Sequence, residues 1–195
     1  AYAVILNEQE KINASHFGPF KILADSVGHS YADYLVKSKV LTTQKVLRMD
    51  EVNLTADLLI AMIEGVKSKK QIKHFYDAYE EQFDDDVEEL EKQFRATMVA
   101  IEAVFGDSLA SSEFRRVHLF YTLFTSFFHG AFGLKGIAEQ RPNVTVGNVE
   151  RLRHALGKVD ELFSKKQEGI RLADDADRFI EDSRRATTDA PVRSR

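Results

Sequence analysis

Six His residues and the acidic residues are the side chains of this chain best suited to acid–base or metal chemistry. His118 and His129 share one face of a helix but lie about 16 Å apart along its axis. That separation is too large for one metal ion. Glu150 with His154, four positions apart, or His74 with Asp77, three apart, could donate two ligands, but neither has a second pair of matching spacing. The separation of His118 and His129 favours two half-buried, hydrogen-bonded side chains, and we expect no metal site.

Three consecutive acids, Asp84 to Asp86, also have the composition of a cation site. A calcium loop requires alternating oxygen ligands, a Gly in the middle and a Glu at the end, and none of these follows. Acidic side chains at the start of a helix interact favourably with its positive end. This run therefore predicts a helix start.

Other reaction motifs are absent from the sequence. With no Cys, the chain has no disulfide, thiol nucleophile or thiolate metal site. It contains no P-loop, no Gly-rich dinucleotide turn, no Gly-x-Ser-x-Gly and no zincin His pair. Ser, His and acidic residues occur, but no motif arranges them. We expect no catalytic residue and no cofactor in this chain.

Two clusters of basic residues are candidates for nucleic-acid contact, although such clusters commonly form a solvated face. The formal net charge of -4 and the pI of about 5.9 argue against broad electrostatic binding to nucleic acid. The first cluster adjoins aromatic residues, which favours it as a local contact. The clusters are Lys67, Lys69, Lys70 and Lys73, beside Phe75, Tyr76 and Tyr79; and Arg151, Arg153, Lys165 and Lys166.

These residues must be positioned by helices, because apolar residues recur at helical spacing and the alternation typical of strands is scarce. The Phe-rich stretch 113–134 is apolar on nearly all sides, which is typical of a helix covered by others. We therefore predict an all-α fold, a multi-helix bundle around a Phe-rich central helix at about 113–134. One face of that helix would carry Phe114, Val117, Tyr121, Phe124 and Phe128.

A membrane span is the alternative for this stretch. Val117 to Leu134 holds 18 residues without Lys, Arg, Asp or Glu, which is the lower limit for a spanning helix. Two His, several hydroxyl residues and two Gly oppose that interpretation, as does a mean hydropathy of -0.30. We expect no membrane association. The lack of Cys and of a signal peptide favours a cytoplasmic protein.

Further helices are predicted on both sides of the central one. We expect a helical bundle domain over 1–165, and a charged amphipathic helix with a disordered tail over 166–195. The chain begins at Ala1 without an initiator Met, which leaves open whether it is part of a longer polypeptide. The predicted helices are 7–15, opened by Asn7 and Glu10; 20–39; 44–49; one capped by Asp50 and ended by Gly65; one opened by Ser68 and Gln71 and running to Phe83; 87–105; and 149–166.

Several segments together resemble the helical half of a prokaryotic family whose members carry an N-terminal ParB-like subdomain with an Asp-Gly-Gln-x-Arg motif. The family occurs in GmrSD-type, modification-dependent restriction enzymes and related anti-phage proteins. The resemblance covers about Leu6 to Phe128. It rests on LNEQEKINASHFGPFK (Leu6 to Lys21), VLRMDEVNLTADLLIAMIEGVKSKKQIKHFYDAYEEQF (Val46 to Phe83), FRATMVAIEAVF and FRRVHLFYTLFTSFF.

The motif that the resemblance would assign to nucleotide binding and hydrolysis is absent, and so is the His-containing nuclease domain that often follows it. The resemblance places Asn7, Gln9 and Glu10 in the segment nearest the nucleotide-binding subdomain, so they are candidates for a nucleotide-proximal role. Capping alone also explains Asn7 and Glu10.

The resemblance thus implies a helical subdomain of a restriction or phage-defence protein, without catalysis of its own. Its partner would be a ParB-like subdomain, in cis or in trans. The parent protein would be an NTP-dependent DNA endonuclease, and would supply the nucleoside triphosphate, the divalent metal and the DNA contact. The alternative is a stand-alone helical module for protein interaction or homodimerisation. A small helical enzyme with scattered site residues has no supporting motif.

Overall fold

A computed structural model describes residues 5–138, 148–184, 189 and 193, and every regular element in these ranges is a helix. The all-α prediction is confirmed. The α-helices are α1 (Glu8–Ser15), α2 (Pro19–Lys37), α3 (Thr43–Val46), α4 (Asp50–Glu64), α5 (Ile72–Ala78), α6 (Val87–Phe105), α7 (Val117–Ala131), α8 (Val149–Gln167) and α9 (Asp174–Asp182); the 3-10 helices are η1 (Lys69–Gln71), η2 (Gly106–Ser111) and η3 (Glu113–Arg115).

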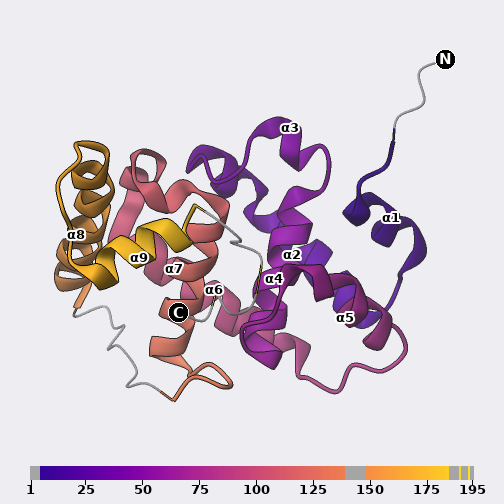
Figure 1. Cartoon of the computed structure of the whole chain (residues 1–195). Coiled ribbons are helices and arrows are strands. Elements are labelled where there is room, and N and C mark those ends of the chain that lie inside the picture. The colour runs from indigo at the N-terminus through magenta and orange to yellow at the C-terminus, as the bar shows by residue number, and fades with distance from the viewer. Residues whose placement is uncertain (1–4, 139–147, 185–188, 190–192, 194–195) are drawn as a thin grey trace.

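Helix α4 is the most enclosed element of the bundle. Eleven of its fifteen residues are buried, because its apolar positions are spread around the helix rather than along one stripe. It contacts α1, α2, α3, α5, α6 and α7, and lies near the middle of the molecule in Figure 1. The N-terminal helices are thus assembled around α4.

The Phe-rich stretch also lies in the core, as predicted, but it is not one continuous helix. A 3-10 turn, η3, comes first, and Arg116 then takes an extended conformation with ψ 130° before α7 begins. Contacts with α8 hold this interruption: the Glu113 amide donates to Asp160 Oδ1 at 2.7 Å, and the Arg116 guanidinium lies over the Phe163 ring. Helix α7 packs on α6 and α4, so it shares the centre of the bundle with α4.

Two predicted helix starts differ from the structure. The residue that caps α4 is Met49, in a left-handed conformation with φ 61°, and Asp50 is the first helical residue. Only three residues separate α3 from α4. Ser68 and Gln71 form no capping box, because the Gln71 amide donates to the Ser68 carbonyl oxygen in η1. Helix α5 ends at Ala78, before the predicted Phe83.

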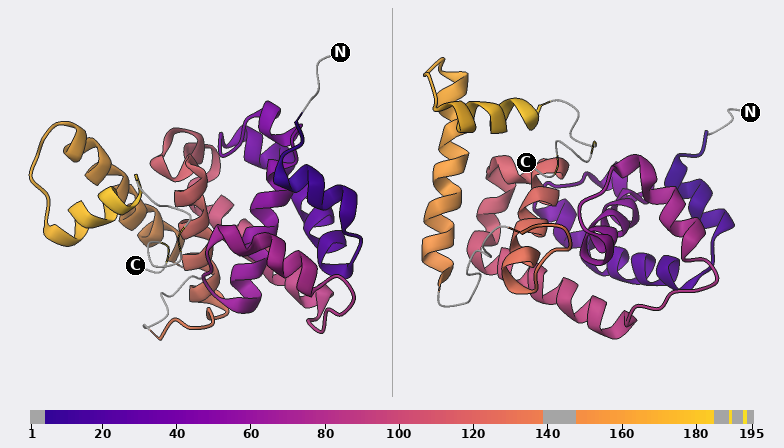
Figure 2. Two further views of the ribbon diagram at one scale, coloured as in Figure 1. Left: turned by 45° about the vertical axis from the view of Figure 1, so that its right-hand side comes forward. Right: turned by 60° about the horizontal axis from the view of Figure 1, so that its bottom comes forward.

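Helices α8 and α9 pack against each other at one edge of the molecule, beside α6 and η3 and away from α1 and α5, and α9 crosses α8 at a large angle (Figure 2). Each contributes one buried side chain, Phe163 from α8 and Ile180 from α9. The Phe163 ring meets Phe179 edge-on, with centroids 6.0 Å apart. The predicted amphipathic helix after residue 166 is therefore present, and it packs on the helix before it.

Both predicted regions include residues that the structure does not describe. These are 1–4 and 139–147 of the predicted bundle domain, and 185–188, 190–192, 194 and 195 of the predicted disordered tail. Asp189 and Arg193 of that tail are described, and both make contacts with the bundle. Within the described ranges, no helix is long and apolar enough to cross a membrane.

Candidate functional site

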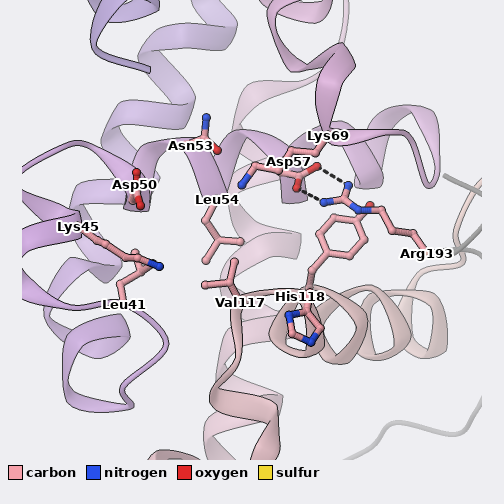
Figure 3. Close-up of a pocket in the computed structure, with 11 residues that line it drawn as sticks. Leu41, Lys45, Asp50, Asn53, Leu54, Asp57, Lys69, Val117, His118 and Arg193 are labelled. Atoms are coloured by element: carbon pink, nitrogen blue, oxygen red, sulfur yellow. Dashed lines mark hydrogen bonds and ion pairs between the residues drawn. The ribbon is translucent and has the colours of Figure 1, made fainter. Parts of the chain in front are cut away.

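A half-open pocket of about 280 Å³ lies between α4, α7, the α2–α3 connection and η1 (Figure 3). Charged and polar side chains dominate its wall. They surround a floor made by apolar residues of α4 and α7. The lining residues are Leu41, Lys45, Asp50, Asn53, Leu54, Asp57, Lys69, Val117, His118, Tyr121 and Arg193.

Asp57 is the key side chain of this pocket because it lies in the middle of the most buried helix. Its residue is 4% exposed, and a buried carboxylate is strongly unfavourable unless it is paired and hydrogen-bonded. Arg193 supplies the pairing from 136 positions further along the chain. Its Nη1 donates to Oδ1 at 2.9 Å and its Nη2 donates to Oδ2 at 2.6 Å. This two-pronged geometry is the strong form of an arginine–carboxylate pair.

Two more groups hold the same guanidinium. Nη1 also donates to the Lys67 carbonyl oxygen at 3.0 Å. The Tyr121 ring lies against the flat face of the guanidinium, with Cζ 4.0 Å from the ring centroid, which is a cation–π contact. Tyr121 is 2% exposed, and burial raises the pKa of its hydroxyl. A carboxylate, a carbonyl oxygen and an aromatic ring thus hold the Arg193 side chain.

The rest of the wall carries both signs of charge. Lys69 extends into the pocket beside Asp57; burial lowers its pKa, and the Asp57 carboxylate partly opposes this shift. Lys45 and Asp50 lie on the side opposite Arg193, and His118 lies below (Figure 3). Burial lowers the pKa of His118, and the nearby Arg116 charge acts in the same direction. The hydrogen bonds described at this pocket join the Arg193 guanidinium to a carboxylate and a carbonyl oxygen, an arrangement suited to binding a cation.

The three residues predicted near a nucleotide lie elsewhere, at the start of α1, where they tie α1 to its neighbours. The Asn7 side chain accepts from the Glu10 amide at 2.8 Å and donates to the Arg48 carbonyl oxygen at 2.8 Å. The Glu10 carboxylate accepts from the Asn7 amide and from Arg48 Nε and Nη2. The predicted capping box is confirmed. These contacts give Asn7 and Glu10 a structural role, and a nucleotide-proximal role stays a prediction.

Gln9 is 2% exposed and forms a bridge between helices. Its amide donates to the Tyr76 hydroxyl of α5 at 3.3 Å, and its carbonyl oxygen accepts from Asn53 of α4 at 3.2 Å. Asn53 also lines the pocket. Of the three residues predicted near a nucleotide, Gln9 is thus connected to the pocket, through the Asn53 side chain.

The four predicted DNA-contact lysines do not share one open face. Lys69 lines the pocket, and Lys67 offers its carbonyl oxygen to Arg193. Lys70 lies 3.4 Å from the Asp189 carboxylate, and Lys73 pairs with Asp77 at 2.8 Å. Lys70 and Lys73 are exposed, and of the four they are the ones placed to reach a nucleic acid.

The sequence patterns pointed to Lys69 of this pocket, and missed Asp57, Tyr121 and Arg193. One local signal existed for Asp57: it is the only acid within an otherwise apolar segment, Leu54 to Ile63, that predicts a helix covered on several sides. Such an acid requires a partner. No spacing rule connects it to Arg193, because the two residues are 136 positions apart.

Three of the six His residues are at least partly buried, namely His16, His118 and His129, whereas the other three are exposed. His16 is buried, and its Nε2 lies 2.8 Å from Asp77 Oδ1. His129 is also buried, and its Nδ1 accepts from the Leu134 amide at 3.0 Å. Among the residues that the structure describes, no three His, Asp or Glu side chains lie together as a metal site would require.

Comparisons of the chain with models of known families, with curated proteins and with solved structures found no match. The family resemblance therefore rests on the sequence segments alone.

Proposed function

We propose that this chain is the helical part of a phage-defence protein similar to the GmrSD-type restriction enzymes. In this role it supports a nucleotide-binding ParB-like subdomain and carries out no catalytic step itself. The observation that carries the proposal is the arrangement at the start of α1. There the segment Leu6 to Glu10, which carries the resemblance, is hydrogen-bonded to the rest of the bundle through Asn7, Gln9 and Glu10.

Arg48 is the centre of this junction. Its guanidinium binds the Glu10 carboxylate, and its Nη2 also donates to the Ile5 carbonyl oxygen at 3.0 Å. Beside it, three apolar side chains remain exposed: Ile5 at 83%, Leu6 at 49% and Leu47 at 77%. An apolar surface beside a fixed chain segment is suited to contact a neighbouring subdomain. We call Ile5, Leu6 and Leu47 the junction patch.

The coding DNA directly upstream of the Ala1 codon tests the proposal. We expect an in-frame strand-like run with Asp-Gly-Gln-x-Arg. An initiator codon immediately before Ala1, with no separate gene for a ParB-like subdomain nearby, would contradict it.

A variant test examines the junction patch in the parent protein. Leu6→Asp with Leu47→Asp should lower nucleotide hydrolysis by the parent severalfold, because the subdomain would no longer be supported. Val99→Asp is the matched control, since Val99 is a 62% exposed apolar residue on α6, outside the patch. The isolated chain should hydrolyse no nucleotide. Hydrolysis by a highly purified isolated chain, lost in Glu10→Gln, would overturn the proposal.

A stand-alone interaction module is the second candidate, and the continuity of the core favours it. One cluster of buried side chains runs from Ile12 in α1 to Ile180 in α9, so the helices cover their own apolar faces. Sedimentation of the isolated chain distinguishes the two candidates. A defined homodimer that dissociates in Leu6→Asp with Leu47→Asp would place the self-association on the junction patch and favour the module.

DNA contact through the parent protein belongs to the first candidate. We expect Lys70→Glu with Lys73→Glu to weaken DNA binding by the parent and to flatten its salt dependence. Unchanged affinity would exclude this cluster as the contact.

A further inference from the structure

We propose that the pocket between α4 and α7 is a binding site for an arginine side chain, and that Arg193 of the same chain is its resident occupant. The ligand class is a guanidinium group carried by a protein segment. The inference is independent of the defence function proposed above.

The geometry of the site selects a guanidinium over other cations. Asp57 presents both carboxylate oxygens side by side, and each accepts a separate N–H, at 2.9 Å and 2.6 Å. A planar guanidinium matches this pair of acceptors, whereas an ammonium is a point charge that cannot bridge them in the same way. The Tyr121 ring, 4.0 Å from Cζ, stacks on a flat cation better than on a tetrahedral one.

The site is formed mainly by rigid core elements. Asp57 and Tyr121 lie on the two helices that share the centre of the bundle, and both side chains are nearly inaccessible. The third acceptor is the Lys67 carbonyl oxygen, which lies in the short connection between α4 and η1. A site held by such elements is pre-organised before its ligand arrives, which lowers the cost of binding.

The pocket also has room and charge to accept the residues that flank an arginine. About 280 Å³ remains open with Arg193 in place, since Arg193 is itself one of the lining residues. Lys45 and Asp50 stand on the opposite side, so neighbours of either charge find a counterpart (Figure 3). Lys69 lines the same wall and interacts electrostatically with Asp57. Lys69 can neutralise the Asp57 carboxylate when Arg193 leaves the site, so that one arginine side chain can be exchanged for another.

The full chain with Arg193→Ala tests the proposal, with Nα-acetyl-argininamide as the probe ligand and Nα-acetyl-lysinamide as its matched control. We expect the variant to melt roughly 10 °C below the wild type, because a buried carboxylate loses its partner. Calorimetric titration should show the arginine probe binding this variant at least tenfold more tightly than the lysine probe. Millimolar arginine probe should recover part of the lost melting temperature.

Comparison of the wild type with Arg193→Ala tests whether Arg193 of the same chain occupies the site and competes with an arginine of another molecule. A tethered Arg193 competes at an effective concentration on the order of millimolar, so the wild type should bind the probe at least tenfold more weakly than the variant. Equal binding by the two chains would overturn Arg193 as the resident occupant. Absence of arginine-probe binding to Arg193→Ala would overturn the site itself, whatever the variant's melting temperature.

Two further variants assign the binding to the named groups. Asp57→Asn in the Arg193→Ala background should abolish probe binding, and Tyr121→Leu in the same background should weaken it severalfold while leaving the carboxylate in place. Arg193→Lys should lose most of the stability that Arg193 supplies. Full stability in Arg193→Lys would show that charge alone suffices and would contradict a guanidinium site.

Discussion

Asp57, Glu51 and His118 differ in whether their buried polar atoms have hydrogen-bond partners. Asp57 is paired with a guanidinium, and Glu51 and His118 each keep a buried atom without a hydrogen-bond partner, Oε2 and Nε2 respectively. Glu51 is 1% exposed on α4, and its Oε1 lies 3.8 Å from His29 Nε2. Burial of an ionisable group without a close partner opposes its charged form. Glu51 and His118 therefore weaken the fold when they are charged.

Glu51 gives the first prediction. Burial raises its pKa above the ordinary 4.5, with the backbone and His29 only partly opposing the shift. As pH rises, the Glu51 carboxyl group loses its proton in the unfolded chain before it does so in the folded chain. The free energy of unfolding therefore decreases as pH rises from the unfolded-state pKa through the folded-state pKa. Glu51→Gln should thus raise the melting temperature at pH 7 more than at pH 4. Glu168→Gln, at an exposed position, is the control and should change little. A lower melting temperature for Glu51→Gln at pH 7 would contradict the prediction.

His118 gives the second prediction, with the opposite dependence on pH. Its pKa lies below the ordinary 6.5, because burial disfavours the charged ring. As pH falls through about 6.5, the unfolded chain takes up this proton first and the stability decreases. Urea unfolding from about pH 7.5 to about pH 5 should show a shallower decrease for His118→Gln than for the wild type. His154→Gln, at an exposed position, should follow the wild type; a parallel curve for His118→Gln would exclude this effect.

Helices α2 and α4 pack extensively against each other, and a glycine permits their close approach at one point. A Cβ atom added to Gly28 would lie 3.0 Å from Val52 Cα and 3.3 Å from the Glu51 carbonyl oxygen. Both atoms belong to the backbone of the most buried helix, which has little freedom to shift. Gly157 on α8 is the contrasting case, since an added Cβ would meet nothing within 4 Å.

The third prediction compares these two glycines. Gly28→Ala should lower the free energy of unfolding by about 1–3 kcal/mol, because the added methyl group overpacks the α2–α4 contact. Gly157→Ala should raise it by about 0.5–1 kcal/mol, the usual gain of Ala over Gly inside a helix. Urea titrations of both variants measure the difference. A stabilised Gly28→Ala would mean that α4 moves readily away from α2.

At the scale of elements, the sequence predicted what depends on local spacing and failed where distant contacts decide. The Asn7–Glu10 capping box was recognised because both partners lie within one helical turn. Ser68 and Gln71 have the same spacing, but a 3-10 turn uses the amide that the cap would need. The interruption at Arg116 depends on α8, and the pocket depends on Arg193, so neither leaves a local signal.

The whole molecule consists of a dense centre and a sparsely anchored edge. Helices α4 and α7 are buried over most of their length, whereas α8 buries Phe163 alone. Helices α8 and α9 are anchored by the buried Phe163 and Ile180 side chains, by the Arg116 guanidinium over the Phe163 ring and by the bond from the Glu113 amide to Asp160. Arg153 of α8 also donates to the Val104 and Ala103 carbonyl oxygens of α6. Regions with few buried contacts open at lower free energy than the core.

The fourth prediction concerns the difference in burial between α8 and the central helices α4 and α7. Native-state hydrogen exchange should show amides of α8 and α9 exchanging at least tenfold faster than those of α4 and α7. Phe163→Ala should accelerate exchange in α8 and α9 further and leave the α4 amides almost unchanged. Equal protection of α8 and α4 in the wild type would show instead that the molecule opens as one cooperative unit.

The ion pair between Asp57 and Arg193 also sets an order of events during protein synthesis. The carboxylate leaves the ribosome 136 residues before the guanidinium that neutralises it. At about 5–20 residues per second, this interval lasts roughly 7–27 s. During that time the apolar helices that pack on α4 are synthesised, but Asp57 of α4 still lacks Arg193. The nascent helices can therefore assemble around α4 early, and the pocket is completed only when synthesis reaches Arg193.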